Sequence, residues 1–289
     1  MLKINISKKI YLIIALILIV ILSAFLVMKG DYLFMKKLYS SEVKSELEKT
    51  VLNNQPFTKD DIVSLPAPVQ RYFRYCGYIG KKKMSNAKIV FEDVDFISNG
   101  KQLKLRSEQY NFVSEPARIA YLSSKVMGII PFEGRDKYQN GKGSMIGKLM
   151  KIITLFDVTG PKMDQSALVT FLAEALIVPN VALQDYIKWE EIDSNKAKAI
   201  MNYGGIKVEG IFSFNDKGEF IKFETNDRYM DKGNGLIEKE RWTAKVENYI
   251  EKNGIRVPGR MKGIWNLSKN DLVYFDGNIT EINFDNSNV

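Results

Sequence analysis

The hydrophobic pattern changes along the chain, and its longest part has the periodicity of β-strands. From about residue 88 to the end, apolar and polar residues alternate over short runs, and turn sequences such as Asn140-Gly141 separate the runs. Alternation with a period of two predicts half-buried strands. Because a parallel crossover needs a dozen residues or more, such short turns predict antiparallel neighbours. We expect roughly ten or eleven strands in one large, strongly curved antiparallel sheet.

One stretch inside the strand region has helical periodicity instead. Asp164 is suited to the N-cap position, and Pro179 stops the helix. A wide apolar face contains Leu168, Phe171, Leu172 and Leu176. A face this apolar needs a sheet to cover it, so we expect the helix at 164–176 on the concave side of the sheet. The predicted fold class is α+β, mainly β, with the sheet shaped as a half-open barrel.

Two short helices are expected near residues 58–77, before the first strand. Thr58 can cap the first of them, Pro68 suits the first turn of the second, and Gly77 suits its C-terminal cap. The second helix carries an apolar stripe at helical spacing, formed by Val69, Tyr72, Phe73 and Cys76.

The N-terminal part contains an uncharged run of 19 residues, 10–28, between Lys9 and Lys29. As a helix this run is about 28 Å long, close to the thickness of the hydrocarbon core of a bilayer. We expect an uncleaved transmembrane helix; a cleaved signal peptide and a buried soluble helix are the alternatives. Lysines at 3, 8 and 9 favour a cytoplasmic N-terminus.

This segment determines the expected organisation of the chain. Residues 1–29 are a cytoplasmic stub and transmembrane anchor, residues 30–57 a charged helical stalk, and residues 58–289 an extracytoplasmic β domain. The expected location is the cell membrane, crossed once, with the membrane contacted through residues 10–28.

The amino-acid composition mainly excludes certain kinds of catalytic and metal site. The chain has no histidine and one cysteine, Cys76, which excludes catalytic triads with histidine, the usual zinc sites and an internal disulfide. The net charge is +8, but residues 1–29 hold four lysines and no acidic residue, so the rest carries only +4. We therefore expect no nucleic-acid partner, no cofactor and no metal, and we do not expect an enzyme.

Three motifs resemble those of an uncharacterised bacterial family whose members are usually membrane-anchored. The first is Leu-Pro-x-Pro-Val-x-Arg-Tyr at 65–72, and the second is Asp136-x-Tyr138 followed by Gly141, Gly143 and Met145. The third is Asp-x-Ser-x-Leu-x-x-Phe-Leu-Ala-Glu at 164–174, where Thr170 stands in place of an arginine in the family pattern. The resemblance implies a fold similar to the half-barrels of periplasmic lipoprotein carriers and implies no established activity.

The aromatic and apolar residues that face the expected interior suggest a ligand pocket between sheet and helix. Its candidate lining residues are Leu168, Phe171, Leu172, Leu176, Trp189, Trp242 and Trp265. Candidates for a polar rim are Glu174, Asp136 and Tyr138. Core packing is the alternative for the tryptophans, and pairing with a basic strand residue is the alternative for Glu174.

The functional hypothesis is that the extracytoplasmic domain binds a lipid or another hydrophobic ligand in this cavity. One alternative is a structural envelope protein without a ligand. Another is a hydrolase that works through carboxylates such as Glu190, Glu191 and Asp193, for which two acids must face each other in a cleft.

Overall fold

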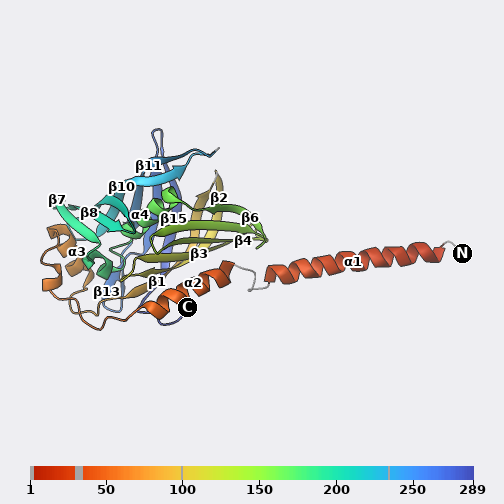
Figure 1. Cartoon of the computed structure of the whole chain (residues 1–289), viewed down its shortest axis with the longest axis horizontal. Coiled ribbons are helices and arrows are strands. Elements are labelled where there is room, and N and C mark those ends of the chain that lie inside the picture. Colours follow the sequence, from red (N-terminus) through yellow and green to blue (C-terminus); the bar gives the residue numbers. More distant parts are fainter. Residues whose placement is uncertain (1–2, 30–34, 99, 234) are drawn as a thin grey trace.

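A strongly curved antiparallel sheet of 13 strands is the main feature of the computed structural model, which describes residues 3–29, 35–98, 100–233 and 235–289 (Figure 1). The strand order is β6-β5-β4-β3-β2-β1-β15-β14-β11-β10-β9-β8-β7, and every neighbouring pair is antiparallel. Two strands form a separate hairpin. The predicted large antiparallel sheet is confirmed.

The elements have the following bounds. The helices are α1 (Lys3–Lys29), α2 (Met35–Lys49), η1 (Asp60–Ile62), α3 (Ala67–Cys76), α4 (Pro161–Ala173) and η2 (Pro179–Leu183). The first strands are β1 (Asn86–Ser98), β2 (Lys101–Phe112), β3 (Ala117–Val126), β4 (Ile130–Gln139), β5 (Lys142–Leu149) and β6 (Ile153–Val158). They are followed by β7 (Ile187–Asp193), β8 (Lys196–Tyr203), β9 (Ile206–Phe214), β10 (Phe220–Asp231) and β11 (Ile237–Glu247). The last are β12 (Ile250–Lys252), β13 (Ile255–Val257), β14 (Arg260–Asn266) and β15 (Asp271–Phe284).

The strand boundaries differ from the sequence pattern in several places. Residues 255–267 read as one strand in the sequence, but the structure divides them into β13 and β14. Residues 144–156 also read as one run in the sequence, but a turn at Met150 and Lys151 splits them into β5 and β6, and this turn contains no glycine, asparagine or proline. Conversely, residues 272–275 and 278–284 read as two short strands in the sequence but belong to one long strand, β15. The start of the predicted stalk, residues 30–34, and Asn99 of the turn sequence Ser98-Asn99-Gly100 lie outside the described residues.

The helix α4 lies on the concave side and connects the two ends of the sheet. It packs against β4 and β5 on one side and against β9 and β10 on the other. The helix begins at Pro161, three residues earlier than predicted, so Asp164 lies in its first turn and does not cap it. The backbone of β5 approaches closely at Gly143, where an added Cβ would lie 2.4 Å from the carbonyl oxygen of Met163. The predicted helix on the concave side is confirmed.

The two ends of the sheet also touch each other directly. The turn after β4 meets the turn after β8, and a Cβ on Gly204 would lie 2.7 Å from the Cα of Gly141. Glycine at both positions lets the two backbones approach, so the curved sheet is nearly closed at this point.

The helix α3 has the limits that its sequence predicts. It ends at Gly77, which adopts the left-handed conformation with φ 76°, and its stripe of Val69, Tyr72, Phe73 and Cys76 is buried. The Tyr72 hydroxyl donates a hydrogen bond of 2.6 Å to the carbonyl oxygen of Leu176, just beyond α4. The expected first helix of this pair is only the short turn η1.

The helix α2 falls within the segment predicted to be a stalk, yet it packs against β3 and β4. Its buried residues Met35, Tyr39 and Val43 form a second apolar cluster with Tyr110, Ile119 and other residues of the sheet. On the same face, Glu42 accepts a hydrogen bond of 2.6 Å from Lys137 of β4. Residues 35–49 are therefore part of the folded domain, because their apolar side chains are covered by the sheet.

The helix α1 extends away from the domain (Figure 1). Its described side chains between residues 10 and 20 are mainly large, apolar and exposed. Judged on the described residues only, none of the helices combines the length and the apolar character needed to cross a membrane.

Candidate functional site

A buried ionic network joins the end of α4 to the concave face of β2, β3 and β4. Nε of Arg118 lies 3.1 Å from each carboxylate oxygen of Glu174, and its Nη1 lies 2.7 Å from Oδ2 of Asp136. The side-chain amides of Gln109 and Asn111 also donate to Glu174, at 2.8 and 2.7 Å. Two of the predicted polar-rim residues, Glu174 and Asp136, are thus brought together by an arginine that the sequence analysis did not select.

Charge pairing governs this network. Burial opposes the charged form of Arg118, but the neighbouring carboxylates of Glu174 and Asp136 outweigh it and raise the pKa of the guanidinium. Glu174 is 6% exposed, and four donated hydrogen bonds satisfy its carboxylate. Of the two alternatives for Glu174, the structure places it as the partner of a basic strand residue.

The third rim candidate, Tyr138, lies in the same region but outside the network. Its side chain is buried, its ring centroid is 6.5 Å from that of Phe171, and burial raises the pKa of its hydroxyl. Within the described residues its hydroxyl has no hydrogen-bond partner.

The first turn of α4 ties the helix to both ends of the sheet. The carboxylate of Asp164 accepts hydrogen bonds from the backbone of Gly143, at 2.8 Å, and from Nζ of Lys142, at 3.0 Å. The hydroxyl of Ser166 accepts one from the backbone of Tyr229 on β10, at 3.0 Å. These motif residues hold the helix in place and are themselves satisfied.

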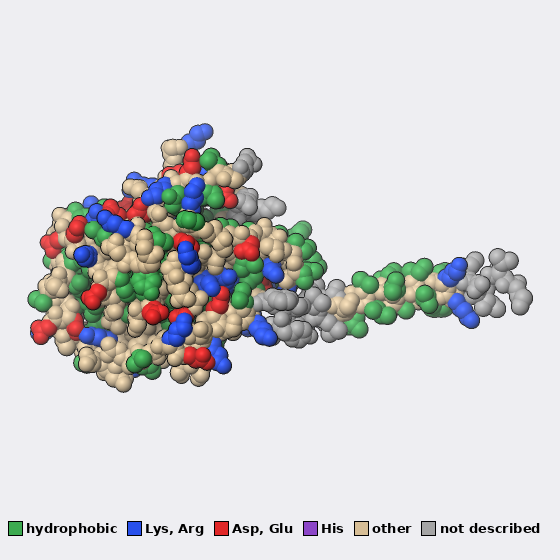
Figure 2. All heavy atoms as spheres, in the orientation of Figure 1, with side chains coloured by type: hydrophobic (Ala, Val, Ile, Leu, Met, Phe, Trp, Pro, Cys, Tyr) green, Lys and Arg blue, Asp and Glu red, His purple; other side chains and the backbone are tan. Residues whose placement is uncertain are grey.

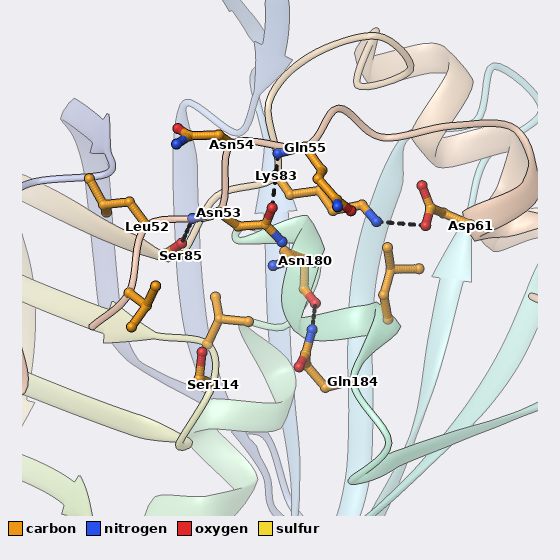
Figure 3. Close-up of a pocket in the computed structure, with 13 residues that line it drawn as sticks. Leu52, Asn53, Asn54, Gln55, Asp61, Lys83, Ser85, Ser114, Asn180 and Gln184 are labelled. Atoms are coloured by element: carbon orange, nitrogen blue, oxygen red, sulfur yellow. Dashed lines mark hydrogen bonds and ion pairs between the residues drawn. The ribbon is translucent and has the colours of Figure 1, made fainter. Parts of the chain in front are cut away.

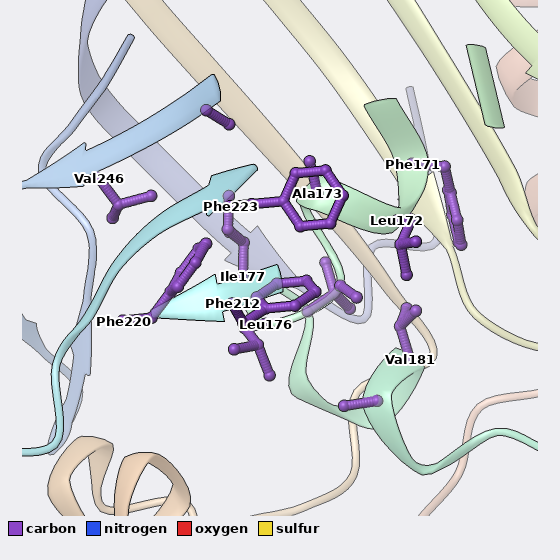
Figure 4. Packing of buried hydrophobic residues seen from close by; sticks show 14 of the residues in the cluster. Phe171, Leu172, Ala173, Leu176, Ile177, Val181, Phe212, Phe220, Phe223 and Val246 are labelled. Atoms are coloured by element: carbon purple, nitrogen blue, oxygen red, sulfur yellow. The ribbon is translucent and has the colours of Figure 1, made fainter. Parts of the chain in front are cut away.

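The apolar face of α4 is packed into the core. Leu168, Leu172 and Leu176 have no exposed surface, and Phe171 is 1% exposed. Figure 4 shows how Phe171, Leu172 and Leu176 lie among residues of the core such as Phe212, Phe220 and Phe223. These four predicted lining residues therefore contact protein side chains in this structure.

The predicted tryptophans are separated into two places. Trp189 on β7 packs against Phe212, with ring centroids 5.1 Å apart, and its Nε1 donates to the carbonyl oxygen of Ala182. Trp242 and Trp265 are direct neighbours on β11 and β14. Only these two belong to the surface described next.

A row of aromatic side chains crosses four adjacent strands on the concave face; we refer to Phe96, Tyr274, Trp265 and Trp242 as the aromatic strip. The ring of Tyr274 lies 6.2 Å from that of Phe96 and is stacked 5.8 Å from that of Trp265. Nε1 of Trp242 donates to the Tyr274 hydroxyl at 3.2 Å. The two tryptophans are buried, whereas Phe96 and Tyr274 are half-buried, so the strip extends from the core towards solvent.

Arg228 on β10 lies at the buried end of the aromatic strip. Its guanidinium carbon is 4.5 Å from the ring centroid of Trp242 and 5.6 Å from that of Trp265. Its Nη1 donates to the carbonyl oxygen of Ser166, at 3.1 Å, and to the hydroxyl of Thr170. Thr170 stands where the family pattern has an arginine, and in this chain a guanidinium reaches that position from the sheet.

One buried N–H group of the Arg228 guanidinium is unused. Among the described residues no carboxylate forms an ion pair with it, and its buried Nε has no hydrogen-bond partner. An unpaired cation stacked on two indole rings is a site that favours an anion nearby.

Two surface cavities lie away from the aromatic strip. One of about 590 Å³ is lined mainly by polar residues of the segment before η1 and of η2 (Figure 3). Lys83 and Asp61 form an ion pair there at 2.6 Å. The second, of about 460 Å³, lies beside Gly143 and Asp164. Neither is lined by any of the predicted pocket residues.

Two of the three acids considered for hydrolysis have structural partners. Oε2 of Glu191 accepts a hydrogen bond of 2.7 Å from the backbone of Ala67 at the start of α3, and Asp193 accepts one from the backbone of Asn195. Among the described side chains, no three acidic or cysteine residues are arranged to hold a metal ion.

The sequence analysis missed Arg118, Arg228, Gln109 and Asn111. A signal was present for the last two, because Ser107, Gln109 and Asn111 alternate on one face of β2 where apolar residues are expected. For the two arginines the pattern held no signal, since both lie in strands whose alternation also fits a solvent-exposed position.

Comparisons with known proteins identify the family. A LolA superfamily protein from Nitrosomonas europaea is 11% identical, with a TM-score of 0.41 over 75% of this chain and 94% of that one. A domain from Vibrio parahaemolyticus that is named for outer membrane lipoprotein sorting is 10% identical, with a TM-score of 0.37 over 70% and 84% of the two chains. No curated protein matches the sequence. The resemblance to an uncharacterised family is confirmed by a match over residues 55–277, and the chain belongs to the family of unknown function DUF6544.

Proposed function

We propose that this protein binds an amphipathic anionic molecule on the concave face of its sheet. An acyl chain lies along the aromatic strip, and its anionic head group pairs with Arg228. The observation that carries the proposal is the unpaired guanidinium of Arg228, stacked over Trp242 and Trp265 at 4.5 and 5.6 Å.

The surroundings of the strip suit an acyl chain. Phe96 pairs across the strands with Leu103, and Trp265 pairs with Leu272; both leucines are half-buried. The apolar surface thus extends beyond the residues that α4 covers, and burying it against a ligand is favourable by about 25 cal/mol per Å². This binding site differs from the pocket between sheet and helix that the sequence predicts, because the ligand lies beside α4 and not beneath it.

We further propose that α1 anchors the domain in the cell membrane, with the N-terminus in the cytoplasm. The uncharged run of 19 residues, 10–28, lies within α1, and lysines flank it at 9 and 29. Ile10, Leu12 and Leu16 are at least half exposed, which is costly for a helix in water and favourable in lipid. The ligand is then a lipid or a lipid fragment from the outer side of that membrane.

The experiment uses the full chain in phospholipid vesicles with a fatty acid that carries a photoreactive group on its acyl chain and a free carboxylate. After illumination, cross-linked peptides are identified by mass spectrometry. We expect cross-links on β1, β14 and β15 in addition to those on α1. Arg228→Gln should reduce the strand cross-links by about tenfold, as expected from the loss of one charge-assisted hydrogen bond.

The matched control is Arg241→Gln, because Arg241 is an exposed arginine of β11 that pairs with Glu224. Its cross-links should equal those of the wild type, and the α1 cross-links serve as an internal reference. Cross-links confined to α1 would overturn the ligand proposal and favour a structural envelope protein, for which the close packing of Leu168, Leu172 and Leu176 is the supporting observation.

A further inference from the structure

Large apolar side chains project from two neighbouring turns at one end of the sheet. Met127 and Ile129 in the turn between β3 and β4 are 87% and 74% exposed. Ile152, Ile153 and Leu155, at the start of the edge strand β6, are also exposed. We refer to these five residues as the distal tip. Figure 2 shows hydrophobic side chains gathered at the end of the domain that faces α1.

The local backbone makes apolar residues an unexpected choice at these turns. Met127 and Gly128 have φ values of 53° and 77°, and the backbone of Ile129 donates to the carbonyl oxygen of Val126. Met150 and Lys151, with φ 53° and 64°, form the same kind of turn. Turns with two central residues at positive φ favour asparagine, aspartate and glycine. Methionine and isoleucine here gain nothing from the fold, which indicates that they contact something outside it.

The chain enters the domain at the same end. Along α2, Tyr39 bonds to Glu108, Glu42 to Lys137, and Glu46 to Gln139 near the far end of β4. The helix therefore runs in the same direction as β4, and its first residue, Met35, lies towards the turn that carries Met127. In Figure 1 the labels of β4 and β6 lie at the end of the domain that faces α1.

The short connection to α1 and the positive charge around the distal tip indicate that the tip contacts a membrane. Only five residues, 30–34, separate α1 from α2, and five residues span at most about 18 Å. Exposed Lys36 and Lys37 at the start of α2 and exposed Lys125 beside the tip add positive charge at this end. Apolar side chains surrounded by lysines suit the boundary between head groups and acyl chains of an anionic bilayer.

We infer that the distal tip docks into the bilayer in which α1 is anchored, and that anionic lipid strengthens the contact. This inference rests on the proposed anchoring by α1. Because the turn between β1 and β2 lies at the same end of the sheet as the tip, docking turns Phe96 of the aromatic strip towards the lipid surface. A molecule leaving the membrane then has a short path to the concave face.

The test uses the full chain in vesicles of phosphatidylcholine and phosphatidylglycerol that contain a quencher attached to the acyl chains. A fluorophore is attached at Met127→Cys, and in a matched control at Ile192→Cys. Ile192 is an exposed apolar residue of β7, at the end of the domain away from α1. The natural Cys76 is buried, so it should take up no label in the folded protein.

We expect at least about twofold stronger quenching at position 127 than at 192, falling when phosphatidylglycerol is omitted or Ile129 is changed to Glu. Equal quenching at both positions in a chain that floats with the vesicles overturns docking and leaves anchoring intact. A chain that does not float overturns both. A change in the fluorescence of the label at position 127 that depends on protein concentration, and not on the quencher, shows that a second copy of the chain covers the tip. This outcome also overturns the inference.

Discussion

Nε of Arg118 lies 3.1 Å from both carboxylate oxygens of Glu174, and this contact joins β3 to the C-terminal end of α4. The side-chain amides of Gln109 and Asn111 donate to the same carboxylate. Together these contacts fix the position of the helix on the concave face. Asp164 and Ser166 hold the opposite end of the helix. The helix is therefore held by polar contacts at both ends and by apolar packing between them.

Replacing Glu174 with Ala should destabilise the protein by about 3–5 kcal/mol, since Arg118 then remains buried with only Asp136 as an ionic partner. The free energy of unfolding from denaturant titration measures this. The control is Glu190→Ala on exposed β7, which should change stability by less than about 0.5 kcal/mol. If both variants unfold at the same denaturant concentration, the network does not stabilise the fold.

Gly143→Ala should loosen α4 from β5. The added Cβ would lie 2.4 Å from the carbonyl oxygen of Met163 and 2.8 Å from the Cβ of Ala167, so the helix must move away. We expect a loss of about 1–3 kcal/mol in stability and faster amide exchange in α4. Gly134→Ala on the neighbouring strand is the milder control, because its nearest neighbour is a methyl group of Leu122 at 3.3 Å. Similar exchange rates in both variants would contradict the close approach.

Cys76 should react with thiol reagents at pH 8 only when the protein unfolds. Burial raises the pKa of its thiol from 9.0 to about 12. Because the folded state holds this proton more tightly than the unfolded chain, the stabilisation is fully present below about pH 9 and is lost as the pH rises towards 12. The difference in unfolding free energy between the wild type and Cys76→Ala should therefore narrow above pH 9. Stoichiometric labelling of the native protein at pH 8 would refute the burial of this thiol.

The sequence by itself determined the local elements and the fold class. Alternation with a period of two predicted the strands, and the short turns predicted their antiparallel pairing. The stripe of Val69, Tyr72, Phe73 and Cys76, with Gly77 after it, predicted α3. These features are readable because they depend on neighbours within a few residues along the chain. The turn at Met150 and Lys151 was missed because its positive φ values occur without the residues that favour them.

Only the tertiary structure decided which side chains meet. Arg118 and Glu174 are 56 residues apart, and Arg228 and Thr170 are 58 apart. Nothing in the alternation of a strand distinguishes an arginine that points at a helix across the concave face from one that points into water. The same holds for α2, whose charged sequence suggested a stalk, although Met35, Tyr39 and Val43 are covered by the outer residues of the sheet. Strand order and curvature bring these partners together, and both arise from long-range packing that no local pattern encodes.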